Sequence, residues 1–555
     1  MKKILIINLR RLGDVYTTGH LINSLTQHQN ANISLMVYKE SMQAARYLNN
    51  CVHTYNIDRQ EIITLKTNKL FSDGFALEKI FTQLSEIKNQ HWDEIINYSN
   101  DLIGAYLCSY LKNSTDKVIG IHFNNERNIV SQNDWELLFN DVLPTIRYSP
   151  VHFVDCYHKM AGVALARQGD KLLTGPEKNA QAAFAINNIK REQTGSEATA
   201  KVIGIQLKTA SPTKDIPENT IIELIKSIKS NRELAPILLI APNEEERELA
   251  NRINTHFNGE IVVMEADLET VASILKNIDL LVTPDTAIKH IADLVGTSLL
   301  EISLGHAPFL KQGSYSQGSL ILTDIITDRN FSSNSATSSI ESKITAHDIM
   351  ASILYFFSKT KTIRPRLSND VTLYGCTFDK LGARYSVIAG TVDSQTEIHR
   401  LMSRQLIDLI YDQNESMEIY DDAIEFGLVA ATNWSTKEKA NVTLVMKDLL
   451  GTLRSLLQSL ESKKSSRDFI MNLGRLISHA DSNSLIQIPV MMFKTKIESI
   501  NTKTFEENAK EVEILLYELK SDIQKVLHCI KQLGDNIAIQ KRAEFINKEP
   551  EHINS

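Results

Sequence analysis

The stretch ILIINLRRLGDVYTTGH, residues 4–20, decides the fold of the first half of the chain. Its first six residues form a short apolar run, interrupted only by Asn8 and without alternation, which is typical of a central strand covered on both faces in a parallel sheet. Gly13 permits a sharp turn, and from Val15 onward the apolar spacing is helical. Asp14 is therefore expected at or beside a helix N-terminus, at the sheet edge where open α/β sheets bind ligands. The alternative role of Asp14 is to cap that helix.

The composition favours a folded multidomain protein of the reducing cytoplasm. A chain of 555 residues with 43% apolar residues supports three or four domains. Its net charge of −7 gives no basic domain, so no nucleic-acid partner is expected. Five scattered cysteines without a CxxC pair argue against a disulfide framework or a zinc site. No stretch approaches the roughly 20 apolar residues that span a bilayer, and the first apolar run is too short for a signal peptide.

Strand-like and helical runs alternate through the first two thirds of the chain, which predicts βαβ units and parallel sheets. Residues 1–185 form one predicted Rossmann-like domain and residues 196–357 a second, after a polar, helix-prone stretch. The second domain starts again with a strand at KVIGIQL, residues 201–207. Two α/β domains in tandem predict a cleft between them.

The last third of the chain has a different character. Residues 358–370 carry four basic residues and a proline, which indicates a linker; the alternative is a patch that contacts an anionic membrane from its cytoplasmic side. Residues 371–555 are predicted to be a mainly helical extension after a short strand-like section. Across residues 512–533 the apolar residues alternate steps of three and four, as in a bundle or short coiled coil. This extension is expected to serve packing or assembly, including a homo-oligomer.

The strongest chemical signal is DLLVTPDTAIKHIADLVGTSLLEI, residues 279–302. A buried strand runs into Asp285, and a helix begins at Thr286, whose hydroxyl joins the free N–H groups and the dipole in a predicted anion site. His290 lies on the same helix face and can point at that site. Lys289 adds charge nearby, or pairs with the acidic residue four positions on. The alternative makes Asp285 a cap and His290 a packed or exposed helical residue.

Two further loops follow strands of the second predicted domain. In KTASPTKDIP the side chains of Lys208, Thr209, Ser211 and Lys214 combine hydroxyl donors with fixed positive charge, which suits a diphosphate. The alternative is an ordinary capped loop. In APNEEEREL, Glu244 starts a helix where acidic residues favour the dipole whatever else they do.

Together these segments resemble glycosyltransferase family nine, the ADP-heptose:lipopolysaccharide heptosyltransferases. ILIINLRRLGDVYTTGHLINSL is similar to the family's opening signature, and LLVTPDTAIKHIADLVGTSLLEISLG to its Asp-Thr-Gly-x-x-His-x-x-Ala-x-x-Gly-x-Pro segment. TKDIP resembles its Lys-x-Trp-Pro and APNEEEREL its Glu-rich stretch. The resemblance covers residues 1–357 and implies the glycosyltransferase type B fold. The acceptor would bind to the first domain and the nucleotide sugar to the second.

The resemblance also implies roles for single residues. Asp14 would be the general base. Ala287 stands where the family usually has Gly, and Ile216 where it has Trp, so the donor's identity stays open. The donor-side candidates are Lys214, Glu244, Asp285, Thr286, Ala287 and His290, with Lys208, Thr209, Ser211, Lys289 and Arg10 as additional candidates.

The implied activity is transfer of heptose or a related sugar from a nucleotide-diphosphate sugar, such as ADP-heptose, to a lipopolysaccharide core or another glycan. The chain contains no Asp-x-Asp, so no metal or cofactor is expected. A single displacement with one base predicts inversion at the anomeric carbon. Two alternatives remain: a protein glycosyltransferase with another donor, and a non-catalytic scaffold that assembles through its helical tail.

Overall fold

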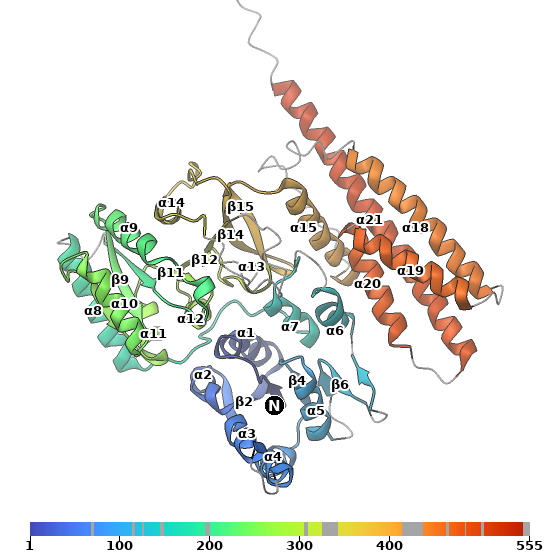
Figure 1. The fold of residues 1–555 in the computed structure, drawn as a ribbon, viewed down its shortest axis with the longest axis horizontal. Helices are drawn as coiled ribbons and strands as arrows, with labels where there is room; N and C mark the ends of the chain where they lie inside the picture. The colour runs from blue at the N-terminus through green and yellow to red at the C-terminus, as the bar shows by residue number, and fades with distance from the viewer. Residues whose placement is uncertain are drawn as a thin grey trace, which may run out of the picture. The chain divides into compact units, whose positions relative to one another are not determined.

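A computed structural model of the chain describes residues 1–67, 72–113, 117–124, 127–131, 133–144, 149–194, 200–304, 309–324, 342–412, 437–461, 466–482, 484–500 and 504–547 (Figure 1). The chain forms two compact units. One comprises Met1–Glu136 and Val151–Thr391, and the other Leu137–Pro150 and Val392–Ser555. We describe each unit separately.

The first unit begins with a five-stranded parallel sheet in the order β3-β2-β1-β4-β5. The apolar run at the start of the chain forms β1, the central strand, and Ile4, Leu5, Ile6 and Ile7 are fully buried as predicted. The strands are β1 (Lys2–Ile7), β2 (Ala31–Tyr38), β3 (Cys51–Ile57), β4 (Glu94–Asn97) and β5 (Lys117–Ile119). A small antiparallel pair, β6 (His122–Phe123) and β7 (Ile129–Val130), follows.

Helices cover both faces of this sheet. Residues of α4 and α5 pack into an apolar cluster with β1, β2 and β4 on one face, whereas α1 contacts α2, β2 and α7. The helices are α1 (Leu12–Gln29), α2 (Met42–Tyr47), α3 (Arg59–Thr67), α4 (Ser72–Lys88), α5 (Leu102–Leu111) and α7 (Phe153–Ala161). The next helix along the chain, α8 (Pro176–Thr194), packs against the second sheet instead.

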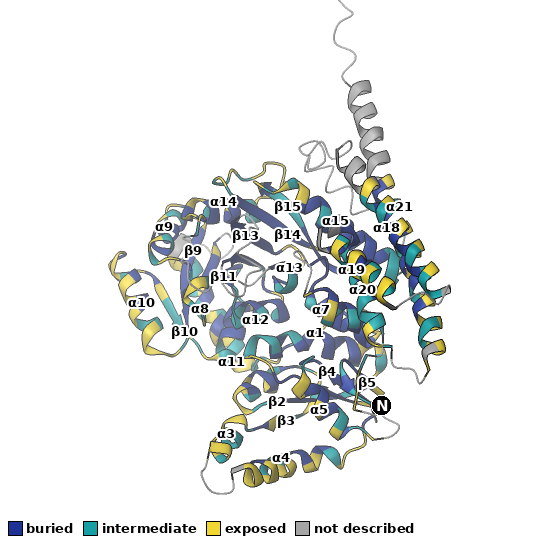
Figure 2. Ribbon diagram, turned by 45° about the vertical axis from the view of Figure 1, so that its right-hand side comes forward, coloured by how far each residue is buried: buried dark blue, intermediate teal, exposed yellow. Residues whose placement is uncertain are grey.

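The second sheet has eight strands in the order β10-β9-β8-β11-β12-β13-β14-β15. The first six are parallel, and the pairings β13–β14 and β14–β15 are antiparallel. The strands are β8 (Lys201–Gln206), β9 (Leu234–Ile240), β10 (Val262–Glu265), β11 (Leu280–Pro284), β12 (Leu299–Ser303), β13 (Leu320–Asp324), β14 (Val371–Asp379) and β15 (Gly382–Gly390). Figure 2 shows these strands as largely buried, with exposed residues gathered on the helices outside them.

The helices of this half position the predicted anion site. α12 follows β11 and packs directly against α1 of the first sheet, so the two α/β halves meet at these two helices. The helices are α9 (Glu218–Lys229), α10 (Glu244–Thr255), α11 (Leu268–Leu275), α12 (Ala287–Val295), α13 (Phe309–Gln312) and α14 (Ala346–Phe357).

The strand-like section at residues 371–390 belongs to this second sheet. The sequence grouped it with the helical extension, but β14 pairs with β13 from Val371 to Gly375, and the first unit runs on to Thr391. The pairing joins segments far apart in the chain, which local periodicity does not reveal.

The second unit is helical. Its helices are η2 (Leu138–Val142), α15 (Ser394–Ile407), η5 (Asp408–Asp412), α18 (Lys437–Glu461), α19 (Ser466–Ser482), α20 (Ser484–Glu498) and α21 (Phe505–Asn547); α6 (Asp134–Leu137) leads into it. The periodicity predicted for residues 512–533 falls on α21. Val512, Leu516, Leu519, Ile523, Val526 and Ile530 are buried there, while the side chain of Leu533 lies outside the described residues. The predicted fold class, two tandem Rossmann-like domains with a helical extension, is confirmed.

Candidate functional site

Asp14 lies in the first turn of α1, directly beyond the carboxyl end of β1. The helix begins at Leu12, its N-cap is Arg11, and Gly13 is a helical residue rather than a turn. The alternative in which Asp14 caps the helix is therefore wrong. Its carboxylate instead accepts a hydrogen bond from the backbone N–H of Arg11, as the third helical residue does in a capping box.

The electrostatics of Asp14 suit a base. Burial raises the pKa of its carboxyl, the guanidinium groups of Arg10 and Arg11 lower it in part, and the negative charge of Asp285 raises it further. The net pKa lies above the ordinary value, which strengthens the carboxylate as a proton acceptor. Arg10 is held in place by its Nε, which donates to the Ser99 carbonyl at 2.6 Å.

The hydroxyls of Thr17 and Tyr98 hold the first turn of α1 beside the end of β4. Thr17 Oγ1 donates to the Asp14 carbonyl at 2.8 Å and lies 3.1 Å from the Tyr98 hydroxyl. Because the only proton of Thr17 Oγ1 is committed to that carbonyl, the Tyr98 hydroxyl is the donor in the second contact. Asp14 is thus anchored through its backbone carbonyl as well as through the bond that its carboxylate accepts from the Arg11 N–H.

Asp285 lies between β11 and α12 and is paired rather than capping. Its carboxylate accepts from Lys214 Nζ at 2.7 Å and from Lys289 Nζ at 2.6 Å. Burial acts to raise its pKa, but the charges of Lys289 and Lys214 outweigh that effect and hold the pKa well below the usual range. Asp285 is therefore ionised at neutral pH.

The two lysines differ in what they can offer a ligand. Lys289 is fully buried and also binds Glu301 at 3.2 Å and the Gln312 carbonyl at 2.9 Å. Its partners are Asp285 and Glu301, and it makes no ion pair with Asp293 among the described residues. Because Lys289 is paired with two buried carboxylates, its role is structural. Lys214 comes from a surface loop and has one carboxylate partner.

The N-terminus of α12 is shaped by a residue that the sequence did not single out. Thr286 is the N-cap and makes no side-chain cap; its Oγ1 donates to Gln206 Oε1 at 2.7 Å. Thr283 Oγ1 donates to the same oxygen at 2.6 Å. The Thr286 hydroxyl proton is therefore committed, and the backbone N–H groups that begin at Ala287 are the donors left for an anion. The only sequence signal for Gln206 is a polar residue ending the apolar run of β8.

The start of α1 lies against the start of α12, where Gly13 faces His290. A Cβ built on Gly13 would lie 3.2 Å from His290 Cδ2 and 3.7 Å from the Ala287 Cα. Burial lowers the pKa of His290 to about 3, and Lys289 adds to this effect. The imidazole is therefore neutral at pH 7, so it carries one ring N–H and no charge. Asp14 and the predicted anion site meet across this contact.

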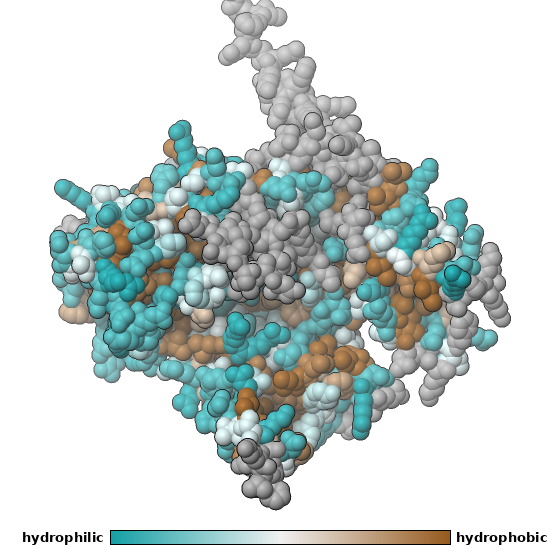
Figure 3. Space-filling model, in the orientation of Figure 1, coloured by the Kyte–Doolittle hydropathy of each residue, from teal (hydrophilic) through white to brown (hydrophobic). Residues whose placement is uncertain are grey.

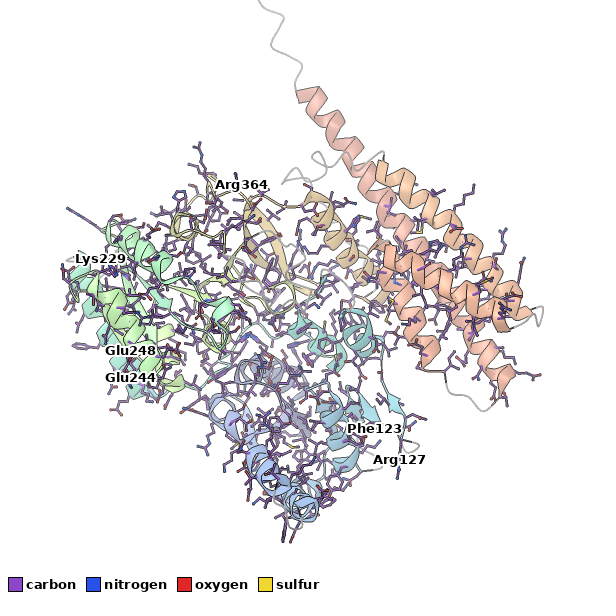
Figure 4. All side chains as sticks on the ribbon, viewed as in Figure 1. Phe123, Arg127, Lys229, Glu244, Glu248 and Arg364 are labelled. Carbon is purple, nitrogen blue, oxygen red and sulfur yellow. The ribbon has the colours of Figure 1, made fainter. Side chains whose placement is uncertain are left out.

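The remaining predicted residues are not brought into this cluster. Lys208 pairs with Asp215 at 2.9 Å and Glu245 at 3.0 Å. Thr209 Oγ1 donates to the Ser211 carbonyl within their own loop. Glu244 starts α10, is exposed, and pairs with Arg247 at 3.2 Å; Figure 4 shows it with Glu248 at the outer edge of the second sheet.

Two further kinds of feature are absent from the residue ranges that the structure describes. Within those ranges, no cluster of three or more His, Cys, Asp and Glu side chains is placed to hold a metal ion. No helix in the same ranges is long and apolar enough to cross a membrane.

Comparison with known proteins identifies a family for part of the chain. Residues 81–304 match the model of "Glycosyltransferase family 9 (heptosyltransferase)", which confirms the predicted resemblance over that range. No curated protein matches the sequence.

Three solved structures are similar to this chain. A glycosyl transferase family 9 protein from Veillonella parvula DSM 2008 is 16% identical, with 58% of this chain and 85% of that chain covered and a TM-score of 0.44. E. coli heptosyltransferase WaaC with ADP is 16% identical, with 57% and 91% covered and a TM-score of 0.41. E. coli ADP-heptose lps heptosyltransferase II is 14% identical, with 64% and 98% covered and a TM-score of 0.43.

Proposed function

Residues 81–304 form a glycosyltransferase family 9 domain, and we propose that the chain transfers a heptose or a closely related sugar from a nucleotide-diphosphate sugar to a glycan hydroxyl. The observation that carries this proposal is the meeting of two helix N-termini. One presents Asp14, and the other presents free backbone N–H groups beside Lys214 and His290. A base and an anion site on facing helices are the two groups that this transfer needs.

The donor's diphosphate would lie at the N-terminus of α12. Helix N–H groups and the helix dipole bind phosphate oxygens, and Lys214 supplies a full positive charge. To reach a phosphate, Lys214 would exchange its contact with Asp285 for one with the donor. His290 would donate its ring N–H to the same group. The sequence resemblance makes ADP-heptose the first donor to test.

Asp14 would take the proton of the acceptor hydroxyl as that oxygen bonds to the anomeric carbon. The bond from the anomeric carbon to the diphosphate oxygen breaks in the same displacement, and the electron pair leaves with the nucleoside diphosphate. The charge that grows on this leaving group is stabilised by Lys214 and the helix N-terminus. A single displacement with one base inverts the anomeric configuration.

The acceptor and the cellular location are proposed on grounds other than the geometry of the donor site. We propose a lipopolysaccharide core or another glycan as acceptor, with action on the cytoplasmic side. The five cysteines are scattered along the chain without a CxxC pair, which suits that reducing compartment.

Calorimetric titration of the full chain with ADP-heptose, ADP and UDP tests the donor assignment. We expect ADP-heptose to bind and Lys214→Ala to weaken its binding by about tenfold or more, the usual loss when a charge-assisted hydrogen bond is removed. Lys229→Ala is the matched control, because Lys229 pairs with Glu260 at 2.6 Å on the surface and away from α12. The anomeric configuration of the product, measured by NMR, then tests inversion.

Each alternative has its own result in the same titration. Binding of UDP without ADP would mean a different donor. No nucleotide binding would favour the scaffold that assembles through its helical tail. Transfer to a polypeptide and not to a glycan would assign a protein acceptor.

A further inference from the structure

Helix α5 is apolar on its outer face as well as its inner face. Its sequence, LIGAYLCSYL, contains no charged residue. Cys108 and Leu111 are buried in the cluster under the sheet, whereas Leu102, Ile103, Tyr106 and Tyr110 point outward. A helix that is hydrophobic all round is normally buried on all sides. The outer face of α5 is instead exposed.

Helix α4 extends the exposed surface. Phe81 contacts Tyr110 with ring centroids 5.7 Å apart, and Leu77 lies one helical turn before Phe81. Tyr106 packs on Phe123 at 4.5 Å, which links the surface to the β6–β7 pair. We call the six residues the α4–α5 face; they are Leu77, Phe81, Leu102, Ile103, Tyr106 and Tyr110, and each is between 37% and 64% exposed.

Figure 3 shows hydrophobic atoms gathered over these elements on the visible side of the molecule. Single exposed apolar residues are common, but a contiguous group of this kind marks a site of interaction.

Three cations border the α4–α5 face. Lys88 Nζ lies 5.5 Å from the centre of the Tyr110 ring and donates to the carbonyls of Tyr110 and Lys112. Lys112 Nζ donates to the Phe123 carbonyl, and Arg127 stands in the loop beyond Phe123 (Figure 4). In the part of the chain that the structure describes, none of the three is paired with a carboxylate. Three positive charges beside an apolar surface would attract an anionic partner.

We propose that the α4–α5 face docks on the surface of a bilayer that contains anionic lipids. The face offers two tyrosine hydroxyls as its only side-chain hydrogen-bonding groups, whereas a protein interface carries about one hydrogen bond per 100–200 Å². A lipid surface needs none from the inserted side chains. Tyrosine rings favour the boundary between lipid and water, and the three cations complement anionic head groups.

The position of α5 connects this surface to the candidate site. α5 follows β4, and the carbonyl of Ser99 between them binds Arg10 beside Asp14. The first turn of α5 thus stands at the same sheet edge as Asp14. Given the proposed function, docking would present Asp14 to an acceptor anchored in lipid.

Vesicle flotation of the full chain tests the proposal. We expect the protein to float with vesicles of phosphatidylethanolamine and phosphatidylglycerol, and far less with phosphatidylcholine alone. The double variant Ile103→Ser/Tyr106→Ser should lower the bound fraction about tenfold, and Lys88→Gln/Lys112→Gln should lower it severalfold on anionic vesicles only. Phe184→Ser is the matched control, because Phe184 is 68% exposed on α8. It should bind like the wild type.

The same experiment can overturn the proposal. Wild-type protein that stays in solution with anionic vesicles would refute it, as would equal flotation of the Ile103→Ser/Tyr106→Ser variant. If the wild type forms a dimer by sedimentation and this variant does not, without lipid binding in either, the face joins two copies instead. Unchanged thermal unfolding of the variants shows that they fold. Flotation needs no donor or acceptor, so its failure is distinct from a failure of the nucleotide titration.

Discussion

At the scale of single residues, Asp14 is the group whose removal tests the chemistry. The variant Asp14→Asn keeps the shape of the side chain but cannot take a proton. We expect kcat to fall by about 10²- to 10⁴-fold, the usual contribution of a general base, with the affinity for ADP-heptose unchanged. Equal losses in affinity and in kcat would contradict the role of a base. Steady-state rates and calorimetry on the same samples give both quantities.

The pKa of Asp14 should also appear in the pH dependence of the rate. The base is active when deprotonated, so the rate should fall as the pH drops through a pKa that burial has raised. Arg10 lowers this pKa, and Arg10→Gln should therefore move the acidic limb to higher pH. Arg59→Gln is the control, since Arg59 pairs with Glu40 on the surface. If the acidic limb lies at the same pH in Arg10→Gln and in Arg59→Gln as in the wild type, the charge of Arg10 does not influence the group that titrates in the rate.

His290 should take up protons when the donor binds. Burial and Lys289 lower its pKa to about 3 in the free protein, and a diphosphate beside the ring would favour the charged form and raise the pKa. We expect uptake of a fraction of a proton, growing as the pH falls from about 7 to 5.5, and tighter binding at the lower pH. Calorimetry in buffers of different ionisation enthalpy measures the uptake.

His290→Asn should abolish this proton uptake, whereas His256→Asn should not, because His256 is exposed at the end of α10. Uptake that persists in His290→Asn would assign the proton to another group.

How far the site could be predicted also depends on single residues. Lys214 and Lys289 could not be distinguished from the sequence, because they differ in burial: Lys289 is enclosed with Asp285 and Glu301. Nor could it show that Gln206 holds the Thr286 hydroxyl, since 80 residues separate them. Residue types near strand ends were predictable, but which of them pair with one another was not.

At the scale of elements, the contact between α1 and α12 makes Gly13 a test of geometry. Both Gly13 and Gly74 are helical glycines, and replacement by alanine generally stabilises a helix by about 0.5–1 kcal/mol. Gly74 faces open space, whereas a Cβ on Gly13 would press on His290. We expect Gly74→Ala to raise the free energy of unfolding with unchanged activity. Gly13→Ala should gain less stability and lower kcat/KM about tenfold by displacing the imidazole.

Chemical denaturation and steady-state kinetics on both variants check this prediction. Full activity in Gly13→Ala would mean that the close approach of the two helices has no part in transfer.

The elements themselves were predictable where the pattern is local. Short apolar runs indicated β1 and β11, and helical spacing of apolar residues indicated α12 and α21. It did not indicate that α1 begins before Gly13, because a glycine in a first turn and a glycine in a loop look alike in sequence. It also did not assign β14 to a sheet, because the partner strand β13 is about 50 residues away.

At the scale of the whole molecule, the second unit contains a piece of chain from the middle of the first. Leu137–Pro150 belongs to the second unit although residues before and after it belong to the first. Within the second unit, η2 packs against α20, and Leu138 is fully buried. No composition shift marks this segment, so the sequence predicted one continuous domain over residues 1–185.

Because Leu137–Pro150 belongs to the second unit, a core substitution in this segment should destabilise the second unit. Leu138→Ala should cost about 2–5 kcal/mol, as other fully buried leucines do, and the loss should fall on the second unit although the residue lies among first-unit sequence. Ile225→Ala is the matched control, because Ile225 is fully buried under the second sheet. Hydrogen exchange resolved by peptide should show faster exchange across α20 in Leu138→Ala and across α9 in Ile225→Ala. Faster exchange in the first sheet, with α20 unaffected, would assign Leu137–Pro150 to the first unit instead.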